Sequence, residues 1–333
     1  MPSVEDQVKQ FTRSLGALRS EVGKVMVGNA QILEGVLVAI VAGGHVLLEG
    51  LPGMGKTQLV KTLADALDLN FSRIQCTPDL MPADILGTTI LSEDENGKRR
   101  FEFQRGPIFG NIVLTDEINR ATPKTQSALL QAMQEAAVTI GATTHTLSQP
   151  FFVLATQNPI ELEGTYPLPE AQLDRFMLKL LVPQSDLEAL VTILDRTTSG
   201  ATPRAQRVLS RDELLELRKL TSSVPAATAV LNYAGRLALA THPEQSYAPK
   251  SVKSYVKYGA SPRGAQAMVM CAKVKALTAG RFNAAIEDIQ WAARPALRHR
   301  LILNFEGEAA GIKTDAIIDE ILASVKEEDA KTR

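Results

Sequence analysis

The sequence Gly50-Leu51-Pro52-Gly53-Met54-Gly55-Lys56-Thr57 decides the fold class of this chain. An apolar run (45–49) precedes it and a helical pattern of leucines at 59, 63 and 67 follows, so the expected order is strand, glycine loop, helix. In such a loop the backbone N–H groups point at phosphate oxygens, and the helix N-terminus adds partial positive charge. Lys56 can then reach the β- and γ-phosphates, and Thr57 can ligate Mg²⁺. The residues expected to bind a nucleotide are Gly50, Pro52, Gly53, Met54, Gly55, Lys56, Thr57 and Gln58.

A second motif lies at 111–117, where an apolar strand ends in two adjacent carboxylates. Successive strand residues face opposite ways, so Asp116 and Glu117 are expected to have different roles. Asp116 is expected to hold the Mg²⁺ shell, directly or through a water. Glu117 is placed to orient or deprotonate an attacking water, which favours hydrolysis over phosphate transfer to another acceptor. A strand that ends in a solvated acidic turn is the alternative.

Composition sets broad limits on what this chain is. It has 333 residues, of which 45% are hydrophobic and 22% charged, enough for one large or two medium domains with real cores. No apolar stretch approaches the roughly 18 residues of a membrane span, so no membrane insertion is expected. Segment 1–10 is polar, so no signal peptide is expected. The two cysteines, Cys76 and Cys271, are far apart, which is typical of a reduced, cytoplasmic protein.

The net charge of −1 is unevenly distributed along the chain. Residues 1–205 are net acidic, which argues against a general nucleic-acid surface there. Residues 206–333 are net basic but lack dense basic runs, so a solvated helical face is the simpler interpretation. A nucleic-acid-dependent motor stays an alternative, and steep salt dependence of DNA binding would support it.

The order of elements predicts an α/β domain followed by a helical one. An apolar stripe at 4–25 predicts a helix with Ser3 as its N-cap, and Asn29 opens a second helix. Strands alternating with helical patterns such as 123–137 predict a parallel sheet covered on both faces. Two β-hairpins are expected, at 87–106 around Asn96-Gly97 and at 138–147. The expected sheet strands are 46–49, 71–76, 112–116, 151–156 and 176–182.

After Val182-Pro183 the strand–helix alternation stops and helical patterns follow one another. We expect a nucleotide-binding domain at 1–198, a linker at 199–205 and a helical domain at 206–333. The helices expected after the sheet are 186–197, 211–222, 227–240, 249–258, 262–279, 286–303 and 314–326.

Three further strings, at 155–159, 170–176 and 259–264, accompany the two motifs, and with them the chain resembles the MoxR family of AAA+ ATPases over nearly its whole length. The first two motifs would fit any phosphate-loop ATPase. The string Glu170-Ala171-Gln172-Leu173-Asp174-Arg175-Phe176 is more specific, and 155–159 and 259–264 add to the resemblance. The resemblance implies a P-loop AAA+ core with a five-stranded parallel sheet between helices, followed by a small all-α lid domain.

The resemblance also assigns site residues. Asn158 matches the sensor-1 residue, and its carboxamide could contact both the γ-phosphate and the attacking water. Arg175 matches the arginine finger, which would reach a neighbouring subunit's nucleotide, although a salt bridge to Asp174 or Glu170 is the alternative. Arg120 is a second candidate for that cation. Arg263 resembles sensor 2 and would reach back to the phosphates.

Two further assignments and the partners are expected from the same resemblance. Val27-Gly28 resembles the segment that lines an adenine pocket, and Gln75 could hold Glu117 away from water. The resemblance implies Mg²⁺-dependent ATP hydrolysis in a ring of six subunits. It further implies a chaperone-like motor that matures or activates a client with a von Willebrand factor A domain partner. A magnesium-chelatase-type motor subunit, a nucleotide-dependent binding switch and a phosphotransferase are the rival interpretations.

Overall fold

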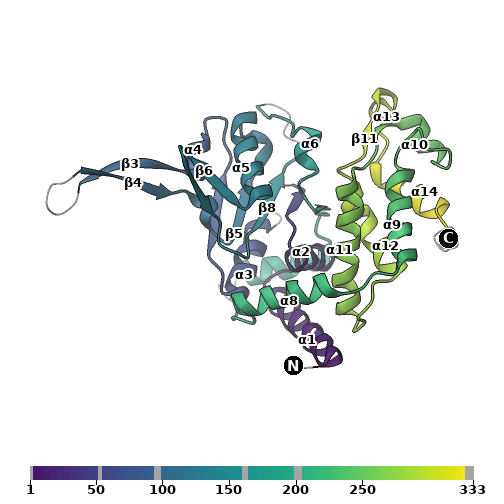
Figure 1. Ribbon diagram of the computed structural model, residues 1–333, viewed down its shortest axis with the longest axis horizontal. Coiled ribbons are helices and arrows are strands. Elements are labelled where there is room, and N and C mark those ends of the chain that lie inside the picture. Colours follow the sequence, from purple (N-terminus) through teal and green to yellow (C-terminus); the bar gives the residue numbers. More distant parts are fainter. Residues whose placement is uncertain (1–2, 52–54, 94–98, 160–163, 199–204, 327–333) are drawn as a thin grey trace.

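The computed structural model describes residues 3–51, 55–93, 99–159, 164–198 and 205–326. Its centre is a five-stranded parallel sheet in the order β2-β5-β8-β1-β9 (Figure 1). The strands are β1 (Val46–Glu49), β2 (Phe71–Gln75), β5 (Ile112–Asp116), β8 (Phe152–Gln157) and β9 (Leu178–Leu181). All five expected sheet strands are therefore present, because their near-continuous apolar runs suit a sheet buried on both faces.

Helices cover both faces of this sheet, as the alternation predicted. One face packs against α2 (Ala30–Ala42) and α3 (Lys56–Leu67), with α1 (Val4–Gly23) packed on these two helices, and the other face packs against α5 (Pro123–Glu135). Ser3 caps α1 by accepting the N–H of Asp6, as expected. The shorter elements of this part are α4 (Pro82–Leu86), η1 (Pro107–Phe109), η2 (Ile118–Arg120), α6 (Glu170–Leu173) and α7 (Leu187–Thr198).

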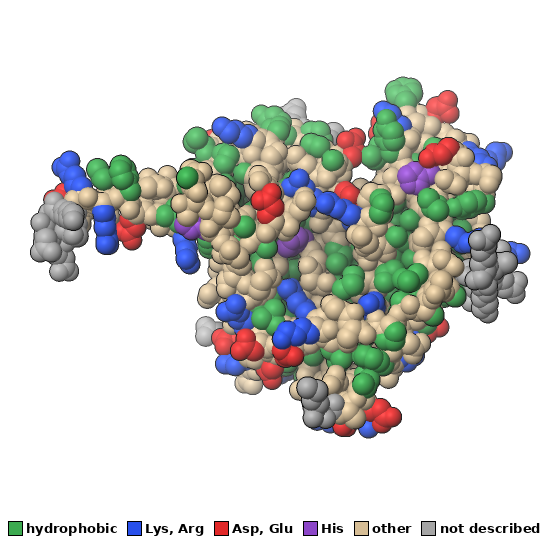
Figure 2. Space-filling view, in the orientation of Figure 1, with side chains coloured by type: hydrophobic (Ala, Val, Ile, Leu, Met, Phe, Trp, Pro, Cys, Tyr) green, Lys and Arg blue, Asp and Glu red, His purple; other side chains and the backbone are tan. Residues whose placement is uncertain are grey.

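Both expected hairpins form. The longer one pairs β3 (Gly87–Glu93) with β4 (Arg99–Arg105) and projects far from the body of the molecule (Figure 1). Its predicted Asn96-Gly97 turn lies outside the described residues. Hydrophobic side chains lie along this projection (Figure 2), including Phe101, which is 80% exposed. The shorter hairpin pairs β6 (Ala137–Ile140) with β7 (Thr143–Thr146) beside the base of the longer one, where His145 stacks on Phe103.

The C-terminal part is helical. Its helices are α8 (Arg211–Ser223), α9 (Thr228–Ala240), α10 (Lys250–Tyr255), α11 (Pro262–Thr278), α12 (Ile286–Leu297), α13 (Phe305–Ala309) and α14 (Thr314–Ser324). One apolar core joins α8, α9, α10, α11, α12 and α14 to α1, α2 and α3, so this part is packed against the sheet domain. No helix among the described residues is both long enough and apolar enough to cross a membrane.

Two of the helices expected here are shorter than predicted. The patterns at 249–258 and 286–303 predicted continuous helices, but their ends form a short antiparallel pair, β10 (Val256–Tyr258) with β11 (Ile302–Leu303). The second helix ends at Leu297 because the next three side chains turn away to hydrogen-bond backbone carbonyls at 176–179. The helical part is thus not purely helical, since long-range contacts override the local helical pattern.

Candidate functional site

The carboxyl ends of β1, β5 and β8 meet at one edge of the sheet, and a cavity of about 440 Å³ opens there. Parallel strands present their carboxyl ends at the same edge, so motifs far apart in the sequence converge at this point. The cavity is lined by Gly55, Lys56, Thr57, Gln58, Arg73, Gln75, Asp116, Glu117, Thr156 and Asn158. The structure thereby brings together the predicted Lys56, Thr57, Asp116, Glu117 and Asn158.

Lys56 is the first residue of α3, and Gly55 before it has a left-handed backbone with φ of 71°. A glycine suits that conformation, which lets the chain turn sharply into the helix. The Lys56 Nζ donates to the carbonyl oxygen of Gly50 at 2.7 Å, across the loop. Partial burial lowers the pKa of Lys56, and the nearby carboxylates of Asp116 and Glu117 oppose that shift. Pro52, Gly53 and Met54 lie outside the described residues.

Asp116 is a buried carboxylate with two partners. Its Oδ2 accepts from the Nε of Arg73 at 2.7 Å, and its Oδ1 accepts from the hydroxyl of Thr156 at 3.2 Å. Arg73 was not expected at this site, because a cation within a strand is usually a solvent-facing residue. The one feature of the sequence that could have indicated a role for Arg73 is its position two residues before Gln75, which places both residues on the same face of β2.

Glu117 leaves the strand in a left-handed conformation with φ of 55°, which is unusual for a residue with a side chain. Its backbone N–H donates to the Thr156 hydroxyl at 2.9 Å, which helps to hold that conformation. Its Oε2 accepts from Gln75 at 3.3 Å and pairs with Arg120 at 3.0 Å. The contact expected between Gln75 and Glu117 is therefore present, and Arg120 lies beside the glutamate of its own chain.

The oxygen donors in this cavity suit a magnesium ion. The hydroxyl of Thr57 and the carboxylate of Asp116 line the same space, and Mg²⁺ prefers such hard oxygen ligands. Asn158 follows β8 and is buried at the cavity wall. The arrangement can place one carboxylate on a metal and keep a second carboxylate and a carboxamide for a water.

Val27 and Gly28 do not line this cavity. Gly28 has φ of 79°, and a Cβ there would lie 2.7 Å from the Cβ of Ala189, so α7 packs closely against this glycine. The segment predicted to contact adenine is thus in close contact with the helix that follows the last sheet strand.

Arg175 and Arg263 lie in a different place. Both line a second cavity, of about 330 Å³, together with His45 and Met177. This cavity borders the amino ends of β1 and β9, where Met177 donates to the carbonyl of His45 at 2.8 Å. The four-residue strand β1 spans about 13 Å between this edge and the phosphate loop.

This placement changes the interpretation of the two arginines. In this structure Arg263 does not line the cavity of its own Lys56, because the helical part packs the start of α11 against the opposite edge of the sheet. Its nearest carboxylate is Asp174, at 3.9 Å. Arg175 makes no ion pair with any described residue, and Asp174 pairs with Arg300 at 2.7 Å instead.

Known protein families and relatives match both the part of the chain that forms this cavity and the helical part. The family model described as "ATPase family associated with various cellular activities (AAA)" matches residues 45–178, and an AAA lid domain matches 249–321. The chain is 42% identical over 306 residues to Chaperone MoxR1 of Mycobacterium tuberculosis, covering 92% of this chain and 80% of that protein. It is 30% identical over 331 residues to Protein MoxR of Methylorubrum extorquens, covering 89% and 90%.

A solved structure agrees with the sequence matches. The crystal structure of a candidate ATPase from Cytophaga hutchinsonii superposes with a TM-score of 0.90 at 43% sequence identity, covering 97% of each chain. The matches include the sheet, the cavity at its carboxyl edge and the helical C-terminal part. The chain belongs to the MoxR family of AAA+ ATPases and carries an AAA lid.

Proposed function

We propose that this protein hydrolyses ATP in the cavity at the carboxyl edge of the sheet. The observation that carries the proposal is the convergence of Lys56, Asp116, Glu117 and Asn158 on that cavity. A lysine at the start of a helix suits a phosphate, and two carboxylates that leave a strand in different directions suit a metal and a water. Thr57 and Asp116 would hold Mg²⁺, which neutralises charge on the phosphates.

The contacts of these side chains suggest how the site changes when ATP binds. Lys56 would exchange the Gly50 carbonyl for a phosphate oxygen, a stronger, charge-assisted hydrogen bond. Glu117 is held through Oε2 by Gln75 and Arg120, and breaking either contact would let its carboxylate turn toward a water and accept a proton. Asn158 would orient that water by donating to the phosphate and accepting from the water.

We infer that a complete site needs a second copy of the chain. Arg175 and Arg263 lie at the opposite edge of the sheet from the nucleotide cavity, so neither is positioned to reach ATP on its own protomer in this arrangement. A head-to-tail contact would bring this edge of one copy onto the phosphates of the next. Heterologous contacts that close by rotation give a ring, and the family resemblance favours six subunits. Arg120, paired with its own Glu117, is the weaker candidate for the inter-subunit cation.

The cellular role we propose is that of a chaperone-like motor in the cytoplasm. The name of the M. tuberculosis relative supports the chaperone role, and the resemblance supports a von Willebrand factor A domain partner. The projecting β3–β4 hairpin, with its exposed Ile90, Leu91 and Phe101, offers a surface for a client protein. No described feature favours nucleic acid as the partner.

The decisive experiment is Glu117→Gln. The amide cannot take a proton, so ATP hydrolysis should fall by about 10²-fold or more while ATP still binds. Steady-state phosphate release and equilibrium binding of ATP with Mg²⁺ measure the two effects. Glu216→Gln, at an exposed carboxylate paired with Lys219, serves as the matched control and should behave like the parent protein. Unchanged hydrolysis in Glu117→Gln would refute the assigned water activator, and failure of the parent to bind ATP would refute the function.

A further inference from the structure

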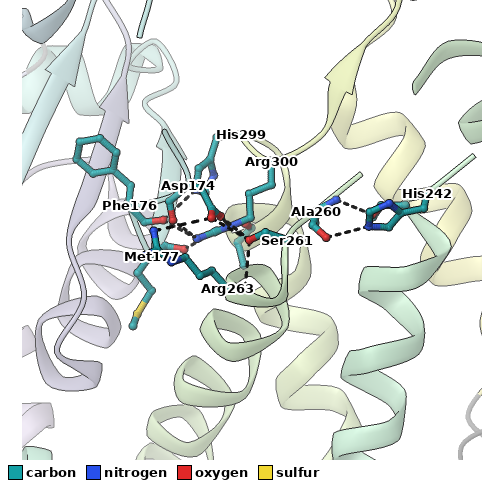
Figure 3. A network of polar contacts seen from close by, with 11 residues as sticks. Asp174, Phe176, Met177, His242, Ala260, Ser261, Arg263, His299 and Arg300 are labelled. Atoms are coloured by element: carbon teal, nitrogen blue, oxygen red, sulfur yellow. Dashed lines mark hydrogen bonds and ion pairs between the residues drawn. The ribbon is translucent and has the colours of Figure 1, made fainter. Parts of the chain in front are cut away.

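Two residues just after helix α12, His299 and Arg300, hydrogen-bond the backbone on both sides of Arg175, at Asp174, Phe176 and Met177 (Figure 3). The Arg300 side chain is only 3% exposed. Its guanidinium donates to the carbonyl oxygens of Asp174 at 3.0 Å, Phe176 at 2.8 Å and Met177 at 3.2 Å. His299 adds a hydrogen bond to the Phe176 carbonyl at 3.0 Å. Burial beside Arg300 lowers the pKa of His299, which is consistent with a neutral ring that donates from Nε2.

The carboxylate of Asp174 ties a second lid helix to the same segment. Its Oδ1 accepts from the Nε of Arg300 at 2.7 Å, and the Ser261 hydroxyl lies 2.9 Å from both carboxylate oxygens. Ser261 is also the N-cap of α11 and accepts the N–H of Arg263 at 3.1 Å. One carboxylate therefore links the start of α11, the end of α12 and the residue directly before Arg175.

These contacts fix Arg175 to the lid. The three carbonyls bound by Arg300 flank Arg175 in sequence, so the backbone at 174–177 cannot shift relative to α12 without breaking several hydrogen bonds. A buried guanidinium that loses its acceptors is costly, which makes the linkage stiff. The side chain of Arg175, by contrast, lines the cavity without an ion pair to any described residue.

We infer that Asp174, Ser261 and Arg300 form a clasp that sets the position of Arg175 according to the position of the lid. The inference rests on the proposed function, in which Arg175 completes the nucleotide site of the next subunit. The clasp then transmits lid movement in one protomer to catalysis in its neighbour. Asp174, Ser261 and Arg300 are positioning residues, because they act through Arg175 and do not line the nucleotide cavity.

Asp174→Asn tests the clasp with little change in shape. The amide keeps an acceptor for Arg300 but loses the negative charge that holds Arg300 and Ser261 together. We expect kcat to fall by at least about tenfold, since small misplacements of catalytic groups are costly. The KM for ATP should stay unchanged, because the variant's own nucleotide cavity is intact. Ser261→Ala, which keeps the pair between Asp174 and Arg300, should show the same pattern to a smaller extent.

Mixed rings separate a positioning role from general damage. Lys56→Ala disables its own site but offers an intact Arg175, so mixing it with Asp174→Asn should restore hydrolysis above either variant alone. In random one-to-one rings roughly a quarter of the sites combine an intact cavity with an intact donor. Parent-like kcat in Asp174→Asn, or lost activity that mixing does not restore, would overturn the clasp.

Two controls make the outcomes distinguishable. Asp288→Asn breaks a buried ion pair with Arg281 inside the lid and should lower the melting temperature while kcat stays unchanged. If Asp288→Asn lost as much kcat as Asp174→Asn, the effect of Asp174→Asn would reflect general damage to the lid, and the clasp would be overturned. Arg175→Ala mixed with Lys56→Ala must also recover activity. If the mixture of Arg175→Ala with Lys56→Ala recovers no activity, the shared site of the proposed function is wrong. If this mixture recovers activity but the mixture of Asp174→Asn with Lys56→Ala does not, only the clasp is refuted.

Discussion

Asp116 is the residue on which two cations compete in the proposed mechanism. Arg73 already donates to its Oδ2 at 2.7 Å, and Mg²⁺ would approach the same carboxylate. Arg73 is half-exposed, so its attraction for Asp116 is partly screened by water. The arginine nevertheless places positive charge beside the metal position, which should weaken Mg²⁺ binding.

Arg73→Met therefore should lower the Mg²⁺ concentration that gives half-maximal ATP hydrolysis. The expected change is roughly threefold, the size of a screened interaction between charges. Magnesium titrations of phosphate release at saturating ATP provide the measurement. Arg73→Lys keeps the charge and should stay close to the parent value. An unchanged or higher magnesium requirement in Arg73→Met would show that Arg73 does not compete with the metal.

The convergence of residues on one cavity could be predicted where the fold class alone fixes the geometry. Lys56, Asp116 and Asn158 lie at or just after the carboxyl ends of three parallel strands, and such ends meet at one edge of the sheet. Arg73 and Arg300 were not predicted, because their roles depend on partners 43 and 126 residues away. Arg263 lines the second cavity instead of the predicted one in this structure for the same reason: its place depends on how the lid packs, which no local pattern encodes.

At the scale of elements, the β3–β4 hairpin depends on two glycines at its base. A Cβ on Gly106 would lie 2.2 Å from the carbonyl oxygen of Ile85, and a Cβ on Gly87 would lie 2.3 Å from that of Gln104. Both contacts are with backbone atoms, which cannot move aside as a flexible side chain can. The close approach at this point joins the hairpin to helix α4.

Gly106→Ala should destabilise the protein by about 2 kcal/mol or more, because the added methyl group overlaps the backbone of Ile85. Urea unfolding gives the free energy, and limited proteolysis should show faster cleavage within 87–106. Gly16→Ala is the matched control, since a Cβ there meets nothing within 4 Å in helix α1. That control should gain up to about 1 kcal/mol from helix propensity. Equal stability of Gly106→Ala and the parent would contradict the close packing.

The elements themselves were mostly predictable. Strands β1 and β5 and both hairpins follow from short runs with clear ends, and the cap of α1 follows from Ser3. The β10–β11 pair and α13 were missed, because the former replaces the ends of two helical patterns once tertiary contacts form.

At the scale of the whole molecule, the sheet separates the cavity proposed to hold the nucleotide from the arginines that would complete the site of another copy. His45 lies just before β1, at the amino edge of the sheet, and its ring hydrogen-bonds two neighbouring backbone segments there. Its Nδ1 accepts the N–H of Val153 at 3.1 Å, and its Nε2 donates to the carbonyl of Met133 at 3.1 Å. Because an N–H only donates and a carbonyl only accepts, these partners fix a neutral ring with its proton on Nε2.

The last prediction concerns acid stability. Burial lowers the pKa of His45 to about 4, below its usual value of 6.5. Between these values the unfolded chain binds a proton that the folded protein does not, so stability falls as the pH falls from about 6.5 towards 4. The His45 ring lines the second cavity, beside Arg175 and Arg263, where water screens its charge. We therefore expect the free energy of unfolding to fall by about 1–2 kcal/mol between pH 7 and pH 5.

His45→Gln should remove that part of the loss, because an amide can accept from Val153 and donate to Met133 without titrating. Urea unfolding of parent and variant at pH 7 and pH 5 measures it. The variant should lose less stability than the parent on acidification, although His299, which is also buried and neutral, keeps some pH dependence in both proteins. Equal losses of stability in the two proteins would mean that the folded protein accommodates a charged His45. The second cavity would then tolerate a further positive charge beside Arg175, Arg263 and Arg300.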